Sequence, residues 1–331
     1  MADVVDWEQV AKEPSDLSDE ELEAALAEDP EDLRSRVQLA RRYLFQILDA
    51  EAQKRRHAHL LWLIEHHPEV DCGYMGISAA LWPEAYAAGK RAWLSVSGAR
   101  PNDPIVINHA SRFFSVDDRS IAKDLMARGA ALEPTVAHWH LCLGFQRIVD
   151  WFDAHDSDAN TRQRLAADAV AEYEQAVALE TDPHAHFAIL TDLVRAASMA
   201  AQYDRAAQVA TRILAIAARD SPDLHPRREY AIHYARAALG NAALANNDIA
   251  SACQYLDAAK SVDGNFPMTH LLGPDFTLAT ALLAHGERDA VIEYLDGIEK
   301  PWPCHNHFKQ WRQMIREGQT PSFRLTAGVS P

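Results

Sequence analysis

A helix-pair signature recurs along this 331-residue chain and limits what the chain can fold into. In its clearest copy the small residue Gly240 is followed twelve residues later by Ala252, and then by Leu256 and Ala259. Spacings of three and four put such residues on one helix face, where small side chains let two helices approach closely. Because a single pair cannot bury this face alone, pairs must stack on one another. The signature predicts an all-α chain of stacked antiparallel helix pairs.

Further copies of the signature occur on both sides of the clearest one. Ala110 is followed by Ala122, and Gly144 lies thirty-four residues after Ala110, the length of one tetratricopeptide repeat. The second helix of the pair that contains Gly144 comes only after about thirteen extra residues. The weaker copies are Val194 with Ala206 and Ala210, Leu278 with Ala290 and Tyr294, and Leu39-Ala40-Tyr43 with Ala52.

Pro, Gly and capping residues divide the chain into five parts. These are an acidic arm with a first short helix (1–32), a helical region (33–100) with an irregular loop (68–82), repeats (101–300) with an insertion at about 150–163, a capping helix (301–323) and a tail (324–331). Ser18 and Glu21 have the spacing of a capping box, which predicts a helix from about residue 19. Asp29-Pro30 is typical of the start of the next helix. In the capping helix, which we expect to begin near His305, an apolar stripe comprises Phe308, Trp311 and Ile315.

The negative charge of the chain is concentrated at its N-terminus. About −12 of the net −16 belongs to residues 1–32, which hold thirteen acidic residues and Lys12. The rest has no basic stripe that could displace counterions, so we expect no nucleic-acid partner. The run Lys54-Arg55-Arg56 is interpreted as a solvated helix face. No apolar run reaches the length of a membrane span, the N-terminus lacks the pattern of a secretory signal, and four scattered cysteines suit a reducing cytoplasm.

Several segments within residues 57–323 resemble a group of uncharacterised bacterial tetratricopeptide-repeat-like (TPR-like) proteins. They are HAHLLWLIEHHPEV, PEAYAAGKRAWL, NHASRFFSVDDRSIAKDLMARGAALEP, AEYEQAVALETDP, AIHYARAALGNAALANNDIASACQYLDAA, GPDFTLATALLAHGERDAVIEYLDGIEKPW and WRQMIREGQTPSF. The resemblance implies a right-handed α-α superhelix (a TPR-like solenoid) and a bacterial, cytoplasmic protein. It brings no known activity or catalytic residue. His109 and Asp275 stand where these relatives tend to have Asn, so the ligand of this chain could differ from theirs.

Histidines in His-x-His pairs are the first chemical candidates. Residues i and i+2 of a helix point about 200° apart, so the two rings cannot share one metal ion. We therefore expect one ring to pack and the other to meet solvent in the three helical pairs, which are His57/His59, His138/His140 and His184/His186. His109 occupies a core position of its repeat, where a hydrogen-bonded histidine is expected.

Two loops hold weaker metal candidates. Cys304, His305 and His307 could meet in a loop, although the same residues suit a helix start, and zinc needs four ligands. His66 and Cys72 lie at the start of a segment with Gly73 and Gly76 that could line a pocket or simply connect two helices. We assign neither loop as a metal site and expect no cofactor.

Aromatic, basic and acidic residues also gather in the clearest repeat. Tyr234 and Asn241 lie two turns apart on one helix, and Asp275 falls on the equivalent face of the next pair by repeat register. Such side chains suit recognition of a peptide, although an ordinary solvated face would have the same composition. The candidate partner-binding groove comprises Tyr230, His233, Tyr234, Arg236, Asn241 and Asp275.

The sequence favours a non-enzymatic scaffold or adaptor that binds a protein or peptide in its concave groove. Phosphate-binding, nucleophile-elbow and zinc-protease motifs are missing from the sequence. One alternative is an inhibitor or immunity-type protein that neutralises a basic toxin or enzyme through the acidic residues 1–32. A second is a metal- or small-molecule-dependent enzyme that uses His66, Cys72 or the Cys304 loop.

Overall fold

The computed structural model describes residues 7, 10, 16–71, 76–154, 158–220, 228–260, 274–299 and 305–323, without the side chains of 305 and 306. These residues form fifteen α-helices and no strand, which confirms the all-α prediction for this part of the chain. They fall into two compact units, one up to Thr135 and the other from Val136 onward. None of the helices described is both long and apolar enough to cross a membrane.

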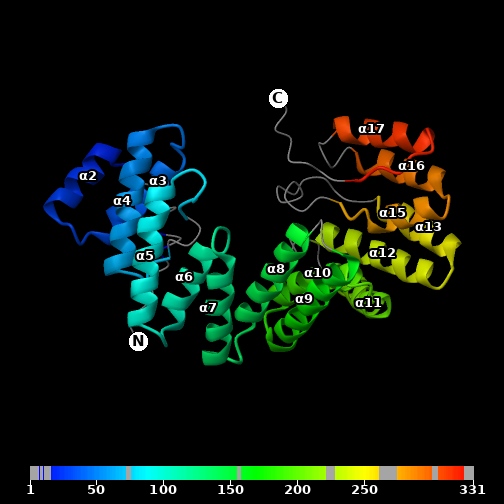
Figure 1. Ribbon diagram of the computed structural model, residues 1–331, viewed down its shortest axis with the longest axis horizontal. Helices are drawn as coiled ribbons and strands as arrows, with labels where there is room; N and C mark the ends of the chain where they lie inside the picture. The colour runs from blue at the N-terminus through cyan, green and yellow to red at the C-terminus, as the bar shows by residue number, and fades with distance from the viewer. Residues whose placement is uncertain are drawn as a thin grey trace. The chain divides into compact units, whose positions relative to one another are not determined.

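The first unit is a series of helices in which each packs on its neighbour in sequence (Figure 1). Its helices are α2 (Asp19–Glu28), α3 (Leu33–Leu44), α4 (Ala50–His66), α5 (Pro83–Ala99), α6 (Pro104–Phe114) and α7 (Arg119–Leu132). Between α4 and α5 the described residues of the loop 68–82 contain no helix, as the glycines there led us to expect.

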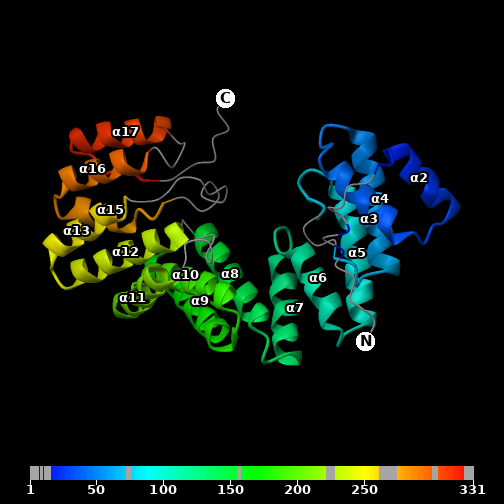
Figure 2. The same cartoon turned by 180° about the vertical axis from the view of Figure 1, so that it is seen from behind.

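The second unit continues the same mode of packing. Its helices are α8 (Ala137–Asp153), α9 (Ala159–Leu179), α10 (Pro183–Met199), α11 (Tyr203–Arg219), α12 (Arg228–Ala245), α13 (Ile249–Ala258), α15 (Thr277–Ala284), α16 (Arg288–Ile298) and α17 (His305–Arg316). Both cartoon views place α16 between α15 and α17 (Figures 1 and 2). Helix α12 also contacts α10 and α15, so it is covered from several sides.

The residues of the repeat signature lie in the interior of each unit. Ala122, Ala169, Ala206 and Ala252 are all fully buried. A Cβ atom on Gly144 would come within 2.7 Å of the Tyr173 ring, so α8 and α9 approach each other as closely as these residues allow. The extra residues of this pair lengthen its helices, because α8 extends to Asp153 and α9 already begins at Ala159.

The helix ends confirm one prediction made from the sequence and contradict another. The capping box is present, since Ser18 Oγ accepts from Glu21 N–H and the Glu21 carboxylate accepts from Ser18 N–H. Asp29-Pro30 does not start the next helix; Asp29 follows the end of α2. The N-cap of α3 is Asp32, whose carboxylate accepts from both the backbone N–H and the hydroxyl of Ser35.

Helix α4 contradicts two expectations about exposure. His57 and His59 are both buried, where one ring was expected to meet solvent. The reason is that α4 packs against α3 on one side and α5 on the other. Tyr43 stacks on His59, and Trp82 meets the His57 ring edge-on. Arg56 is also buried, and its guanidinium donates to the Gly76 carbonyl, so the basic run is only partly solvated.

The apolar stripe of α17 closes the C-terminal end of the second unit. Phe308, Trp311 and Ile315 are buried, as their spacing predicted. The Phe308 and Trp311 rings pack against Phe276, which precedes α15. Trp311 also meets Phe323, whose ring stacks on Phe276 at a centroid distance of 4.8 Å. The start of α17 at His305 agrees with the expected helix start.

Candidate functional site

The six residues of the expected groove lie on α12 and at the start of α15. Tyr230, His233, Tyr234 and Asn241 are buried, with His233 completely inaccessible. Arg236 and Asp275 are half-buried. The expectation that this set lines an accessible groove is therefore wrong for four of its six members, because neighbouring helices cover α12 on several sides.

His233 is the centre of this buried cluster. The Asp275 backbone N–H donates to His233 Nε2 (3.1 Å), and His233 Nδ1 lies 3.0 Å from the Ala259 carbonyl oxygen. Because a backbone N–H can only donate, Nε2 is the acceptor and Nδ1 carries the proton. Complete burial lowers the pKa of His233, which favours this neutral form. One imidazole thus joins the end of α13 to the start of α15.

The other members of the cluster make contacts of the same kind. Arg236 Nη1 donates to the Ala258 carbonyl (2.6 Å), an acceptor at the C-terminal end of α13 that has no partner within the helix. Asn241 Nδ2 donates to Thr277 Oγ1 (2.9 Å), and the Tyr294 hydroxyl donates to the Asp275 carbonyl (3.2 Å). These bonds tie α12, α13, α15 and α16 together.

Two tyrosines extend the cluster toward α10. The hydroxyls of Tyr230 and Tyr234 are 2.6 Å apart, and the Arg195 guanidinium lies 4.8 Å from the centroid of the Tyr234 ring. Burial raises the pKa of both tyrosines, so they remain neutral donors. The cluster as a whole is thus a buried hydrogen-bond network that fixes helix positions.

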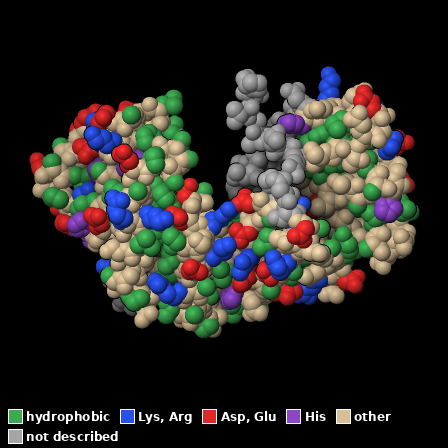
Figure 3. All heavy atoms as spheres, viewed as in Figure 1, with side chains coloured by type: hydrophobic (Ala, Val, Ile, Leu, Met, Phe, Trp, Pro, Cys, Tyr) green, Lys and Arg blue, Asp and Glu red, His purple; other side chains and the backbone are tan. Residues whose placement is uncertain are grey.

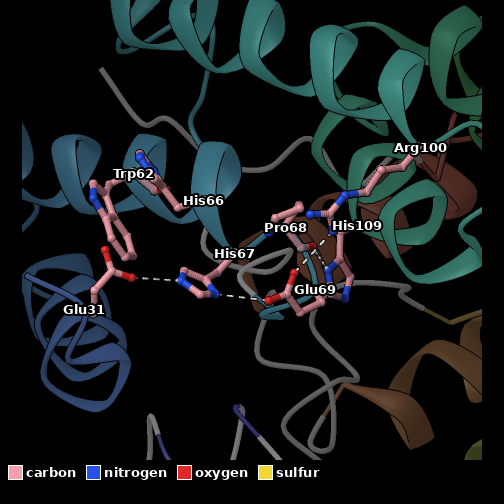
Figure 4. Close-up of polar contacts among 8 residues, drawn as sticks. All are labelled: Glu31, Trp62, His66, His67, Pro68, Glu69, Arg100 and His109. Atoms are coloured by element: carbon pink, nitrogen blue, oxygen red, sulfur yellow. Dashed lines mark hydrogen bonds and ion pairs between the residues drawn. The ribbon is translucent and has the colours of Figure 1, made fainter.

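The two histidines at the C-terminal end of α4 also make structural contacts (Figure 4). His66 stacks on Trp62 at 4.6 Å, and its Nδ1–H donates to the Trp62 carbonyl. The ring nitrogens of His67 face two carboxylates, Glu69 at 3.1 Å and Glu31 at 3.3 Å. This arrangement fastens the loop to the connection between α2 and α3.

The next residues attach the same loop to α5 and α6. His109 Nδ1 donates to the Pro68 carbonyl (2.9 Å), which confirms the prediction of a hydrogen-bonded core histidine (Figure 4). Glu69 lies 3.5 Å from Arg100, and Asp71 forms an ion pair with Arg112 at 2.8 Å. The described part of the loop is therefore held at several points.

The metal candidates are only partly within the described residues. Cys72, Cys304 and the side chain of His305 lie outside them. The His307 ring lies against Trp311, at a centroid distance of 5.8 Å. Across the described part of the chain, no three His, Cys, Asp or Glu side chains converge in a way that could hold a metal ion.

Sequence interpretation missed an exposed apolar surface on α8, which we call the α8 stripe and define as Leu141, Phe145, Val149 and Phe152. Phe145 and Phe152 are 53% and 52% exposed, whereas Leu141 and Val149 are half-buried and Leu141 packs against the core of the second unit. The four residues follow one another at spacings of four, four and three, so they lie on one face of the helix. The opposite face of the same helix holds the buried residues Trp139 and Leu143. Helix α8 is therefore apolar on two sides, and only one of them is covered.

The surroundings of the stripe carry charges of both signs. On the face that Figure 3 draws, basic and acidic side chains are interleaved over α8, α9 and α10. On α8 itself, exposed Asp153 borders the stripe, whereas half-buried Arg147 and Asp150 lie on the other side of the helix. The α8 stripe thus presents exposed aromatic side chains, which are enriched at many protein-binding surfaces.

Comparison with protein-family models finds none that matches the chain, and comparison with curated proteins finds no match. The TPR-like resemblance is carried by the quoted segments and stays a prediction.

Proposed function

We propose that the chain is a TPR-like protein whose helix pairs coil into a right-handed superhelix, and that it acts without catalysis as a scaffold or adaptor. Its partner is an apolar or amphipathic segment of another protein, bound along the α8 stripe. The proposed binding surface is therefore on α8. The α12 cluster, which the sequence suggested as the groove, instead stabilises the interior of the second unit.

The observation that carries the proposal is the exposure of Phe145 and Phe152 on a helix whose opposite face is already buried. Large aromatic side chains contribute most of the binding energy at protein interfaces when a partner desolvates them. Burying each ring removes it from water, which stabilises a complex by about 1.5–3 kcal/mol per side chain before the costs of association.

The chemistry of the surface also defines the partner. Because basic and acidic side chains are interleaved over α8, α9 and α10, a partner of either strong charge would gain little from electrostatics. Apolar anchors at a spacing of one or two helical turns match the stripe best. A helical or extended segment with two such anchors is the expected ligand.

The two alternatives from the sequence stay predictions. Four acidic residues in the described part of the N-terminal arm bond within their own unit: Asp19 to Arg42, Glu23 to Tyr43, Glu31 to His67, and Asp32 to Ser35. Of these four contacts, the ion pair of Asp19 with Arg42 offsets a negative charge that this segment could offer to a basic toxin or enzyme. For the metal- or small-molecule-dependent enzyme, the Cys304 loop lies outside the described residues.

The experiment places a photo-crosslinking amino acid at position 145 and captures the partner in cells that make this protein. The purified partner is then titrated against wild type and the double variant Phe145→Ser/Phe152→Ser by calorimetry. We expect at least a tenfold loss of affinity, which corresponds to about 1.4 kcal/mol.

Val116→Ser is the matched control, since Val116 is an apolar residue of the first unit that is 77% exposed. It should bind the partner as wild type does. Equal affinity of wild type and the double variant would reject the α8 stripe as the binding surface.

A further inference from the structure

The turn between α3 and α4 exposes three large apolar side chains. Phe45, Ile47 and Leu48 are 73%, 58% and 98% exposed. Connections between helices usually hold Gly, Asn, Asp or Ser, whose backbone and side-chain chemistry suits a turn. Here the turn presents apolar area to water instead, and we call these three residues the apolar turn.

Hydrogen bonds from a buried side chain fix the backbone of the apolar turn. Gln53 is 2% exposed, and its Nε2 donates to the carbonyls of Tyr43 (2.5 Å) and Gln46 (3.2 Å). The Asp49 backbone N–H donates to the Gln46 carbonyl as well. A buried side chain bonded to two turn carbonyls keeps the turn in one conformation, so a ligand would meet a preorganised surface.

The start of α2 extends the exposed apolar area. Arg42 Nη1 donates to the Leu17 carbonyl (2.8 Å), and Gln46 Nε2 donates to Asp19 Oδ2 (3.0 Å). These bonds place residues 17–19 beside the turn, and Leu17 is itself 46% exposed. The patch therefore draws on two segments that are distant in sequence.

The rim of the patch is predominantly acidic. Asp16, Glu20, Asp49 and Glu51 are exposed on the segments that form the patch. Among the basic residues, the Arg41 guanidinium carbon lies 5.7 Å from the centroid of the Phe45 ring. Arg42 is paired with Asp19 at 3.1 Å. Lys54 and Arg55 are also exposed on α4, and Arg55 interacts electrostatically with Glu51, so the negative excess around the apolar side chains comes from Asp16, Glu20 and Asp49.

This balance decides between possible occupants. Two copies of the patch face to face would bring two acidic rims together, in a chain whose net charge is already −16. An anionic membrane surface would be repelled in the same way. A protein segment that combines apolar with basic side chains satisfies both the apolar turn and its rim.

We propose that the apolar turn, with Leu17, is a docking surface for a basic amphipathic segment of a partner protein. It lies in the first unit and is independent of the α8 stripe in the second. The chain then binds two protein segments at once, one on each unit.

The probe is a fluorescent 18-residue helix with leucine on one face and lysine on the other, titrated by anisotropy. Wild type binds it, and Phe45→Ser/Leu48→Ser lowers the affinity at least tenfold, because both removed side chains are exposed and central to the patch. Glu20→Gln/Glu51→Gln weakens binding at low salt and flattens its salt dependence. The same helix with glutamate in place of lysine does not bind.

Matched controls distinguish binding at the apolar turn from non-specific binding and from binding at the α8 stripe. Val116→Ser and Phe145→Ser/Phe152→Ser retain wild-type affinity for the probe. Circular dichroism and melting temperature of all variants stay unchanged, since the substituted side chains are exposed.

Three results would overturn the proposal. The first is equal probe affinity of wild type and Phe45→Ser/Leu48→Ser. The second is a dimer in sedimentation that this variant abolishes, which would make a second copy the occupant. The third is Leu48-dependent binding to vesicles of phosphatidylcholine and phosphatidylserine, which would make the surface a membrane contact.

Discussion

At the scale of single residues, burial decides the state of the histidines. His57, His59 and His233 lie in helix-packed interiors, and burial lowers the pKa of each of them. For His57 the pKa falls to about 4, first because of burial and second because of the neighbouring Arg56. The folded protein therefore keeps these rings neutral at pH values where an unfolded chain would protonate them.

Acidification should accordingly destabilise the fold between about pH 6.5 and pH 4. The folded pKa values lie below the unfolded value of about 6.5, so stability is fully present above pH 6.5. Below it the unfolded chain binds more protons, which lowers the free energy of unfolding by up to about 1.4 kcal/mol per pH unit for each histidine. Urea midpoints measured at pH 7.5 and pH 5 should show this loss.

Two variants test whether the buried histidines cause this loss of stability at low pH. His57→Gln should show a shallower pH dependence, whereas His184→Gln, at an exposed position, should retain the wild-type slope. If the urea midpoint of His57→Gln depended on pH as that of wild type does, other groups, such as the carboxylates, would account for the loss of stability.

The sequence identified His109 correctly but not His233, and the difference is physical. A single helix with its repeat partner was enough to place His109 in a core position. His233 was assigned to an accessible groove, yet what covers it on α12 depends on α13, α15 and the residues at their ends. Contacts of this kind join residues far apart in sequence, and helix periodicity does not encode them.

At the scale of helices, close approach at small residues sets the packing of each pair. Gly144 faces the Tyr173 ring, and Gly240 faces Leu278. A ring cannot move aside as easily as the end of a leucine, so the α8–α9 contact is the more sensitive of the two.

Gly144→Ala should therefore lower the stability of the second unit. Overpacking against Tyr173 costs about 1–3 kcal/mol, which outweighs the gain in helix propensity of up to about 1 kcal/mol. Chemical denaturation of the variant measures the net effect.

Gly98→Ala is the matched control, because a Cβ atom at Gly98 meets nothing within 4 Å. It should leave stability unchanged or raise it by up to about 1 kcal/mol. If Gly144→Ala proved as stable as Gly98→Ala, the close α8–α9 approach would not be limiting.

Helix boundaries were predictable where a side chain has one possible role. Ser18 and Glu21 allow only one capping arrangement, and it is present. The segment that follows α2 offers Asp29 and Asp32 as caps, and local spacing does not choose between them. Asp32 serves because Ser35 adds a second hydrogen bond to its carboxylate.

At the scale of the whole molecule, contacts divide the described residues into two units between Thr135 and Val136. Each unit has its own buried side chains, such as Trp93 and Phe114 in the first and Tyr173 and Phe187 in the second. A length of 331 residues exceeds one ordinary hydrophobic core, so the sequence by itself favours more than one compact unit or an elongated repeat array. It did not indicate the boundary, because Pro134 is also the ordinary end of a repeat.

Fragments that end and begin at this boundary should fold separately. Residues 1–135 and residues 136–331 should each give a helical, cooperative thermal transition, because each keeps all of its helix pairs. A fragment of residues 1–165 should be partly unfolded beyond α7, since it separates α8 from most of α9. Loss of cooperative folding in the 1–135 fragment would contradict the division.

The packing of neighbours in sequence has a consequence for biosynthesis. As the chain leaves the ribosome, each helix of the first unit finds its packing partner in the helix made just before it. Residues 1–135 can complete their fold before α8 is synthesised, and contacts of short sequence separation form quickly. The helices of the first unit therefore pack early in synthesis, which limits the time that these nascent apolar helices spend uncovered.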